Sequence, residues 1–384
     1  MATTFRVPVA PSLVEWAVHR SGKTYDELVH RFPELPAWQS GRSDPTFHQL
    51  EDFSHSTYTP FGFFFLQEAP RDELPIPDFR TVGSSPITEP STDLLETIFI
   101  CEQRQEWYRN YALAIGGEPL DFVGKANTST PVVDAAQEIR AALKFTMADR
   151  ASDPNWSAAL RRLIDSAEQL GALVMISGIV GNNTHRSLDP QEFRGFALSD
   201  PFAPLIFVNG ADTKAAQIFT LVHEVAHLWL GATALSDAAL DRTTNNETET
   251  WCNMVAAEVL VPIASLRETY LGAPTTEEFD RLARYYKAST LVVLRRIFDA
   301  GRLTWDQFQL MYDQELSRVM ALLKRSGEGG NFYYTHPLRV SRRFARALIR
   351  DTNAGRTLHR DAFQLLGTRK YKTFVNLGNQ IGAV

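Results

Sequence analysis

The sequence predicts a mainly helical α+β protein with a small β-sheet near the middle of the chain. Two observations lead to this fold class. Apolar residues recur at helical spacing over most of the chain, whereas three short runs, 170–180, 193–198 and 204–208, are apolar and rich in β-formers. We therefore expect a three-stranded sheet surrounded by helices. The chain of 384 residues is long enough for two or three domains.

Residues 1–68 predict a small domain of short helices. Leu13, Trp16 and Ala17 recur at helical spacing, and Gly22 ends that helix. Three further helices are expected at 25–32, 35–38 and 47–58, followed by the aromatic run PFGFFFL. Acidic side chains outnumber basic ones, seven to five, between residues 6 and 52.

A proline-rich stretch, 69–90, predicts a linker between this domain and the rest of the chain. After it we expect helices at 92–115, 131–147 and 155–170, then the sheet. We therefore divide the chain into a helical domain, a linker, a core and a helical, basic C-terminal region, with these bounds: 1–68, 69–90, 91–274 and 275–384.

The strongest chemical signal is the segment FTLVHEVAHLWLG, 219–231. On a helix, His223 and His227 lie one turn apart on the same face, where both imidazoles can bind one zinc ion. Glu224 is placed to take a proton from the water on that zinc, whose pKa falls from about 15.7 to about 7. The flanking residues are apolar on nearly all sides, so this helix should be buried.

A catalytic zinc usually has three protein ligands, so a third is needed. The helix expected at 247–260 offers Glu249, with Asn253 one turn later on the same face. Asn253 could hold the free ring nitrogen of a zinc histidine by a hydrogen bond. Glu247, nearer the helix start, and Glu258, deep in an apolar run, are the alternatives, and we favour Glu249.

These blocks resemble the ImmA/IrrE family of zinc metallo-endopeptidases. The resemblance lies in LDPQEFRGFAL (188–198), FAPLIFVNG (202–210), the segment around His223, ETWCNMVAAEVLVP (249–262) and a block at 329–367. It implies a gluzincin-like core with zinc bound by His223, His227 and Glu249. It also implies cleavage of a repressor or antitoxin protein, usually one with a helix-turn-helix fold, or an association with a toxin.

The N-terminal domain resembles the helix-turn-helix domains of the Xre repressor family, through LVEWAVHRSGKTYDEL, LPAWQSGRSDPT and the aromatic run. Two features depart from that family. The segment at the recognition-helix position is short, with Pro33 before it and Pro36 inside it, and the domain lacks the basic charge that phosphate binding needs. These features favour a scaffold or partner-docking module over a DNA-binding one.

Two further parts of the site remain open at this point. Tyr333, Tyr334 and His336 follow a glycine pair, and any of them is a candidate donor to the developing oxyanion; packing and surface roles are the alternatives. The strand expected at 204–208 could pair with an extended peptide substrate, although an interior strand is favoured.

Charge and cysteine content limit the class of protein. The net charge is −6, but residues 318–372 hold thirteen basic against three acidic side chains. That basic region is either a solvated surface or a site for an acidic protein or nucleic acid. Two distant cysteines, no secretory pattern and no apolar run of about 20 residues predict a cytoplasmic protein without a membrane anchor.

Two other functions compete with the zinc endopeptidase. The chain could be an antitoxin-like or regulatory protein that binds a toxin or repressor without cleaving it, with an idle or structural zinc site. It could also be a DNA-binding repressor through its N-terminal domain. Glu224 favours the peptidase, because a structural zinc site needs no base.

Overall fold

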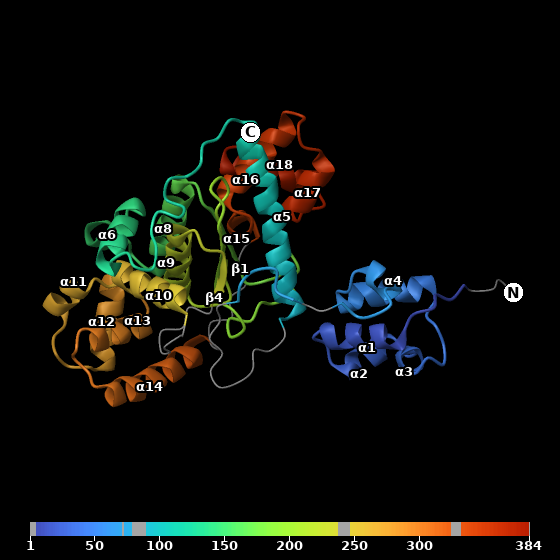
Figure 1. Cartoon of the computed structure of the whole chain (residues 1–384), viewed down its shortest axis with the longest axis horizontal. Helices are drawn as coiled ribbons and strands as arrows, with labels where there is room; N and C mark the ends of the chain where they lie inside the picture. Colours follow the sequence, from blue (N-terminus) through green and yellow to red (C-terminus); the bar gives the residue numbers. More distant parts are fainter. Residues whose placement is uncertain (1–4, 71–72, 79–89, 237–245, 324–331, 384) are drawn as a thin grey trace. The chain divides into compact units, whose positions relative to one another are not determined.

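The computed structural model describes residues 5–70, 73–78, 90–236, 246–323 and 332–383, with the backbone alone at 322–323 and 332–335. The chain forms two compact units (Figure 1). The first comprises Met1–Pro75 and Pro86–Glu96, and the second comprises Ile76–Ser85 and Thr97–Val384. Most of the predicted linker, at 71–72 and 79–89, lies outside the described residues.

The first unit is the expected group of short helices. They are α1 (Pro11–Arg20), α2 (Tyr25–Arg31), α3 (Leu35–Gln39), α4 (Phe47–Thr57) and the 3₁₀ turn η1 (Phe61–Phe65). Thr24 and Thr46 begin α2 and α4 with capping boxes, in which each threonine side chain accepts a backbone N–H. Leu13, Trp38 and Phe53 are buried in the core of this unit.

The second unit is built on a four-stranded mixed sheet, which confirms the mainly helical α+β class. The strands are β1 (Leu173–Ser177), β2 (Gly195–Leu198), β3 (Leu205–Asn209) and β4 (Ala234–Ser236), in the order β1-β3-β2-β4. β1 runs parallel to β3, and the other pairs are antiparallel. The prediction of three strands was wrong, because three residues of β4 are too few to show an alternating pattern.

Helices cover both faces of this sheet (Figure 1). On one face lie α8 (Trp156–Leu170) and α9 (Lys214–Leu230), which share a core with Val174 and Ile176 of β1. On the other lie α5 (Thr92–Ala114), α15 (Phe332–Arg339) and α16 (Arg342–Asn353). On that face Met175 of β1 contacts Cys101 and Arg104 of α5. The alternation of β1 side chains therefore separates the two layers.

α10 (Glu247–Leu260) packs against α9 and α6 (Val132–Ala142). The remaining helices are α7 (Met147–Ala151), α11 (Ile263–Thr269), α12 (Thr276–Tyr286), α13 (Thr290–Asp299), α14 (Trp305–Leu323), α17 (His359–Leu366) and α18 (Tyr371–Ile381). No helix among the described residues is long and apolar enough to span a bilayer.

One predicted helix and one basic run of the C-terminal region are each interrupted. The helix expected at 131–147 ends at Ala142, because Lys144 adopts a left-handed conformation (φ 50°) and Thr146 caps a new helix, α7. The basic run 336–350 is likewise divided between α15 and α16. The break is at Ser341, which has φ 63° and whose hydroxyl accepts the Phe344 N–H at the start of α16.

His336 of α15 is buried on the α5 side of the sheet, at the junction with the C-terminal helices. Its Nε2 lies 3.2 Å from Asn182 Nδ2 and 3.1 Å from the Leu366 carbonyl oxygen. Burial lowers the pKa of His336 to about 4, and the charges of Arg104 and Arg339 act in the same direction. The folded chain therefore holds this imidazole neutral.

This burial predicts a pH-dependent stability. His336 takes up a proton below about pH 6.5 in the unfolded chain but only below about pH 4 in the folded chain. The free energy of unfolding therefore decreases as the pH is lowered from about 6.5 to about 4. When the pH is lowered from 7 to 5, the contribution of His336 should reduce the free energy of unfolding, measured in urea, by about 2 kcal/mol. His336→Gln is expected to reduce this pH dependence, whereas His185→Gln, at an exposed position, should leave it unchanged. Equal pH dependence in both variants would contradict the assignment.

Candidate metal centre

The helix α9 carries the first two candidate ligands and the candidate base. Its first turn is capped by Thr213, whose side chain accepts the Ala216 N–H, and Gly231 ends it in a left-handed conformation. Every residue from Gln217 to Trp229 is buried, as the apolar sequence predicts. This helix therefore holds its polar residues inside the protein on a rigid element.

Three ligand atoms meet at one buried point. His223 Nε2 and His227 Nε2 lie 3.0 Å apart, and the Glu249 carboxylate reaches both, at 3.2 Å from His223 and 2.9 Å from His227. All three ligand atoms lie within 4.8 Å of one another. Both histidine side chains are fully buried, and that of Glu249 is 4% exposed.

Glu249 is brought to this point by α10. Asn246 caps the helix by accepting the backbone N–H groups of Thr248 and Glu249. The alternatives from the sequence lie elsewhere: Glu247 is exposed at the first helical position, and Glu258 is bonded to Arg296 and to the Ile263 N–H.

The donor set suits a zinc ion. Two imidazole nitrogens 3.0 Å apart cannot both face each other as unprotonated acceptors, whereas a shared cation satisfies both and the carboxylate. Burial alone would raise the pKa of Glu249, but His223 and His227 lower it to about 2, so it is a carboxylate. Burial lowers the pKa of His227, which keeps its ring neutral, the form that binds metal.

Glu224 lies beside this cluster in a fully buried position. Burial raises the pKa of Glu224 well above its usual range, and the Glu249 carboxylate adds to this effect. A cation at the three ligands would favour the charged form of Glu224 that a general base requires. β2 passes close by: a Cβ at Gly195 would lie 3.0 Å from Glu224 Oε1 and 2.8 Å from the Phe207 carbonyl oxygen.

Ser236 of β4 completes the described surroundings of the cluster. Its hydroxyl lies 3.3 Å from Glu249 Oε1 and 3.3 Å from His227 Nε2. Sequence reasoning missed both Ser236 and Gly195. Gly195 lies within the segment LDPQEFRGFAL, but its closeness to Glu224 is evident only from the packing of β2 against α9.

β4, not β3, is the strand at the sheet edge next to this site. β3 lies between β1 and β2, which agrees with the interior position favoured from the sequence. The outward N–H of Leu235 in β4 donates to the Pro77 carbonyl oxygen at 2.9 Å, and Asp78 forms a parallel bridge with Leu235. A short segment from the predicted linker therefore already pairs with this edge.

The remaining predicted site residues are less closely tied to the cluster. The side chains of Tyr333 and Tyr334 lie outside the described residues, so their role as oxyanion donors stays a prediction. His336 contacts Asn182 and the Leu366 carbonyl, on the sheet face opposite α9. Asn253 lies one turn after Glu249, but His223 Nδ1 has no hydrogen-bond partner among the described residues, so no Asn253 bond holds that ring.

Residues 167–298 match the family model of the IrrE N-terminal-like domain, an M78 peptidase family. This match supports the ImmA/IrrE relationship and a metallopeptidase-type hydrolase. It covers roughly a third of the chain, from the end of α8 through α13, and includes all three ligands and Glu224. The IrrE-like part thus contains the whole candidate metal centre.

Residues 340–380 match a second family model, described as a domain of unknown function (DUF8813). This segment covers α16, α17 and nearly all of α18, in the basic region. No curated protein and no solved structure matches the chain.

Proposed function

We propose that this chain is a zinc-dependent endopeptidase that cleaves a partner regulatory protein. The observation that carries the proposal is the convergence of His223, His227 and Glu249 on one point with the Glu224 carboxyl buried beside them. A structural zinc site normally has four protein ligands and no base. Here three ligands and a separate carboxylate leave a position for water and substrate.

The chain's residues have distinct parts in the proposed hydrolysis. When bound, zinc activates water and polarises the peptide carbonyl. Glu224 takes a proton from the attacking water and then passes it to the amine nitrogen that leaves. Ser236 and the neighbouring imidazoles keep the Glu249 carboxylate oriented. The apolar surroundings on α9 exclude other water and strengthen these interactions.

The substrate class follows from the ImmA/IrrE resemblance. That family implies a repressor or antitoxin, so we propose a regulatory protein, in particular one with a helix-turn-helix fold. The N-terminal unit would contribute by docking this partner. Its excess of acidic side chains favours protein contacts over phosphate contacts.

The test compares cells that produce the wild-type chain with cells that produce Glu224→Gln. Labelling of new protein amino termini, followed by mass spectrometry, should reveal a cleaved protein in the wild type alone. The purified partner should then be cut at the same bond by the zinc-loaded protein. Cleavage at that bond by Glu224→Gln at the wild-type rate would contradict the proposal.

The deep burial of the three candidate ligands favours one alternative, in which the chain binds a toxin or repressor without cutting it. That function predicts a stable complex of the wild type with an intact partner. It also predicts that Glu224→Gln retains full biological activity. The two functions therefore differ in the response to one substitution.

A further inference from the structure

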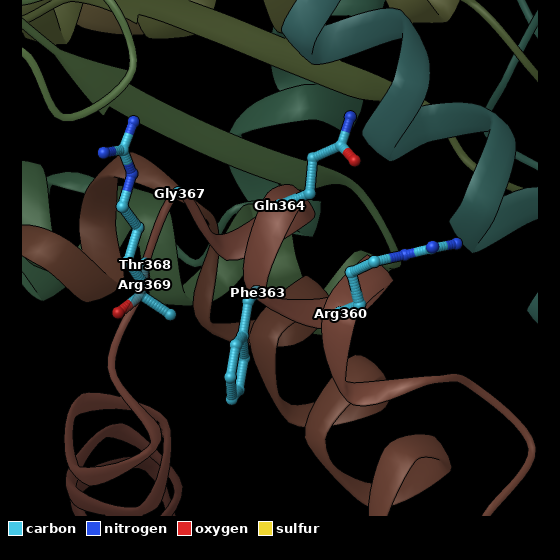
Figure 2. A pocket seen from close by; sticks show the side chains of 6 residues that line it. All are labelled: Arg360, Phe363, Gln364, Gly367, Thr368 and Arg369. Carbon is cyan, nitrogen blue, oxygen red and sulfur yellow. The ribbon is translucent and has the colours of Figure 1, made fainter.

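The C-terminal helices carry a groove that the peptidase function does not use. It has a volume of about 660 Å³ and lies on α17 and the turn that follows it; it is lined by Arg360, Phe363, Gln364, Gly367, Thr368 and Arg369. In Figure 2, Arg360 and Arg369 stand at opposite sides of the groove with Phe363 and Gln364 between them. A ligand in this groove would therefore meet two cations and an aromatic ring.

The arginines around this groove differ from those on α16. On α16, Arg342 pairs with Asp165, Arg343 donates to the Glu168 carbonyl and Arg346 donates to the Ile381 carbonyl, so they stabilise the fold. Near the groove, the acidic partner of Arg360 among the described residues is its neighbour Asp361, in an exposed pair. Among the described residues, no acidic side chain pairs with Arg369, Lys370 or Lys372. Structural contacts therefore do not account for this positive charge.

Aromatic side chains accompany these cations. Tyr371 is 62% exposed, and its ring stacks on that of Phe374. The His359 ring lies 6.0 Å from that of Phe363 and 5.8 Å from that of Tyr371. Cations that follow a phosphate backbone, combined with aromatic rings on which bases stack, are the usual means of binding single-stranded nucleic acid.

We propose that this groove binds single-stranded nucleic acid. Arg360 and Arg369 would contact phosphates, and the rings of half-buried Phe363 and exposed Tyr371 would stack on bases. Lys370 and Lys372 extend the positive charge beyond the groove. A strand of several nucleotides can contact these lysines as well as the groove, whereas a single free nucleotide cannot. An acidic protein would make little use of the exposed rings as stacking surfaces.

The test is fluorescence anisotropy of a labelled oligothymidylate with the full chain over a range of salt concentrations. The double variant Arg360→Ala/Arg369→Ala is expected to bind at least about tenfold more weakly, and its salt slope should fall by about 1.4. The charge-matched control Arg161→Ala/Arg267→Ala, at exposed positions elsewhere, should bind like the wild type. Tyr371→Ala should weaken binding several-fold without changing the salt slope.

Three outcomes would overturn this proposal. One is equal loss of affinity in the Arg360/Arg369 and Arg161/Arg267 double variants, which shows charge attraction alone. Another is displacement of the labelled oligothymidylate by thymidine monophosphate at a concentration similar to that of unlabelled oligothymidylate, which would identify the ligand as a free nucleotide. The third is displacement by polyglutamate at equal charge, which makes it an acidic protein.

A second and independent observation concerns the edge of β4. Residues 76–78, here called the strap, lie at this edge: Pro77 accepts the Leu235 N–H, and Asp78 bridges to Leu235. Ile76 of the strap is 6% exposed, so it is packed into the unit. Ser236, the next residue after Leu235, contacts Glu249 and His227 of the metal centre.

An extended peptide binds most readily by adding a strand to an exposed sheet edge. At this site that edge is β4, and its Leu235 N–H is already used by the strap. Pro77 lacks an N–H, so it accepts the Leu235 N–H but can donate no ladder hydrogen bond to β4 in return. We infer that the strap is an autoinhibitory segment, and that a substrate must displace it to reach the metal centre.

This inference rests on the proposed function, but its test does not require peptidase activity. The rate at which a coloured chelator removes zinc from the loaded full chain measures access to the metal centre. Ile76→Asp should detach the strap and speed removal by about tenfold or more. Ile115→Asp, an equal change at a 60% exposed position, should leave the rate unchanged.

The outcomes distinguish the autoinhibitory strap from the proposed peptidase function. Faster zinc removal together with faster cleavage of the partner supports both. Faster removal without any cleavage supports the strap and contradicts the peptidase. An unchanged removal rate in Ile76→Asp, and in the milder Ile76→Ala if the first variant does not fold, would overturn the strap.

Discussion

Glu224→Gln is expected to slow peptide hydrolysis by roughly 10²–10⁴-fold, because a general base typically contributes this much. Glutamine has nearly the shape of glutamate but cannot take a proton from water. The Glu224 side chain is fully buried beside the candidate ligands and supplies none of the three ligand atoms. We therefore expect the variant to keep about one zinc per chain.

The measurement pairs a cleavage rate with elemental analysis on the same preparations. Glu247→Gln is the matched control, because Glu247 is exposed at the start of α10 and should affect neither quantity. Retention of activity in Glu224→Gln would remove Glu224 from the chemistry. Loss of zinc from this variant would instead make Glu224 part of the ligand set.

Glu249→Ala is expected to reduce the zinc content from about one per chain to nearly none. The substitution removes the carboxylate that reaches both histidines and leaves two imidazoles to hold the ion. Because zinc binds the folded chain and not the unfolded one, the variant should also lose the thermal stabilisation that added zinc gives the wild type. Activity should fall with the metal.

The zinc experiment uses protein purified without a histidine tag, with Glu247→Ala and Glu258→Ala as comparisons. Glu247→Ala should retain zinc. Glu258→Ala should reduce stability, since it removes one of the two carboxylates that pair with buried Arg296, but should bind zinc while folded. Full zinc occupancy in Glu249→Ala would show that another residue supplies the third ligand.

The sequence predicted the candidate metal centre because that part depends on local spacing. The interval of His223 and His227 on a helix places both rings on one face whatever the rest of the fold is. The apolar flanks of this helix also required it to be buried, which made an unsatisfied Glu224 improbable. Glu249 followed from ligand number and from helix phase.

Other features depended on contacts between distant segments. Ser236 reaches the ligands only because β4 pairs with β2, and β4 itself has too few residues for a periodic signal. The breaks at Lys144 and Ser341 arise where single residues adopt left-handed backbone conformations, which hydrophobic periodicity does not encode.

By itself, then, the sequence determined the fold class and predicted the three residues that meet in the buried cluster, because helical period and residue chemistry are local properties. Tertiary structure alone decided which strand forms the edge beside the candidate metal centre, that the strap pairs with that edge at Leu235, and which of the C-terminal arginines remain available to a ligand. Each of these depends on hydrogen bonds or ion pairs between residues far apart in the chain, and no local pattern specifies such partners.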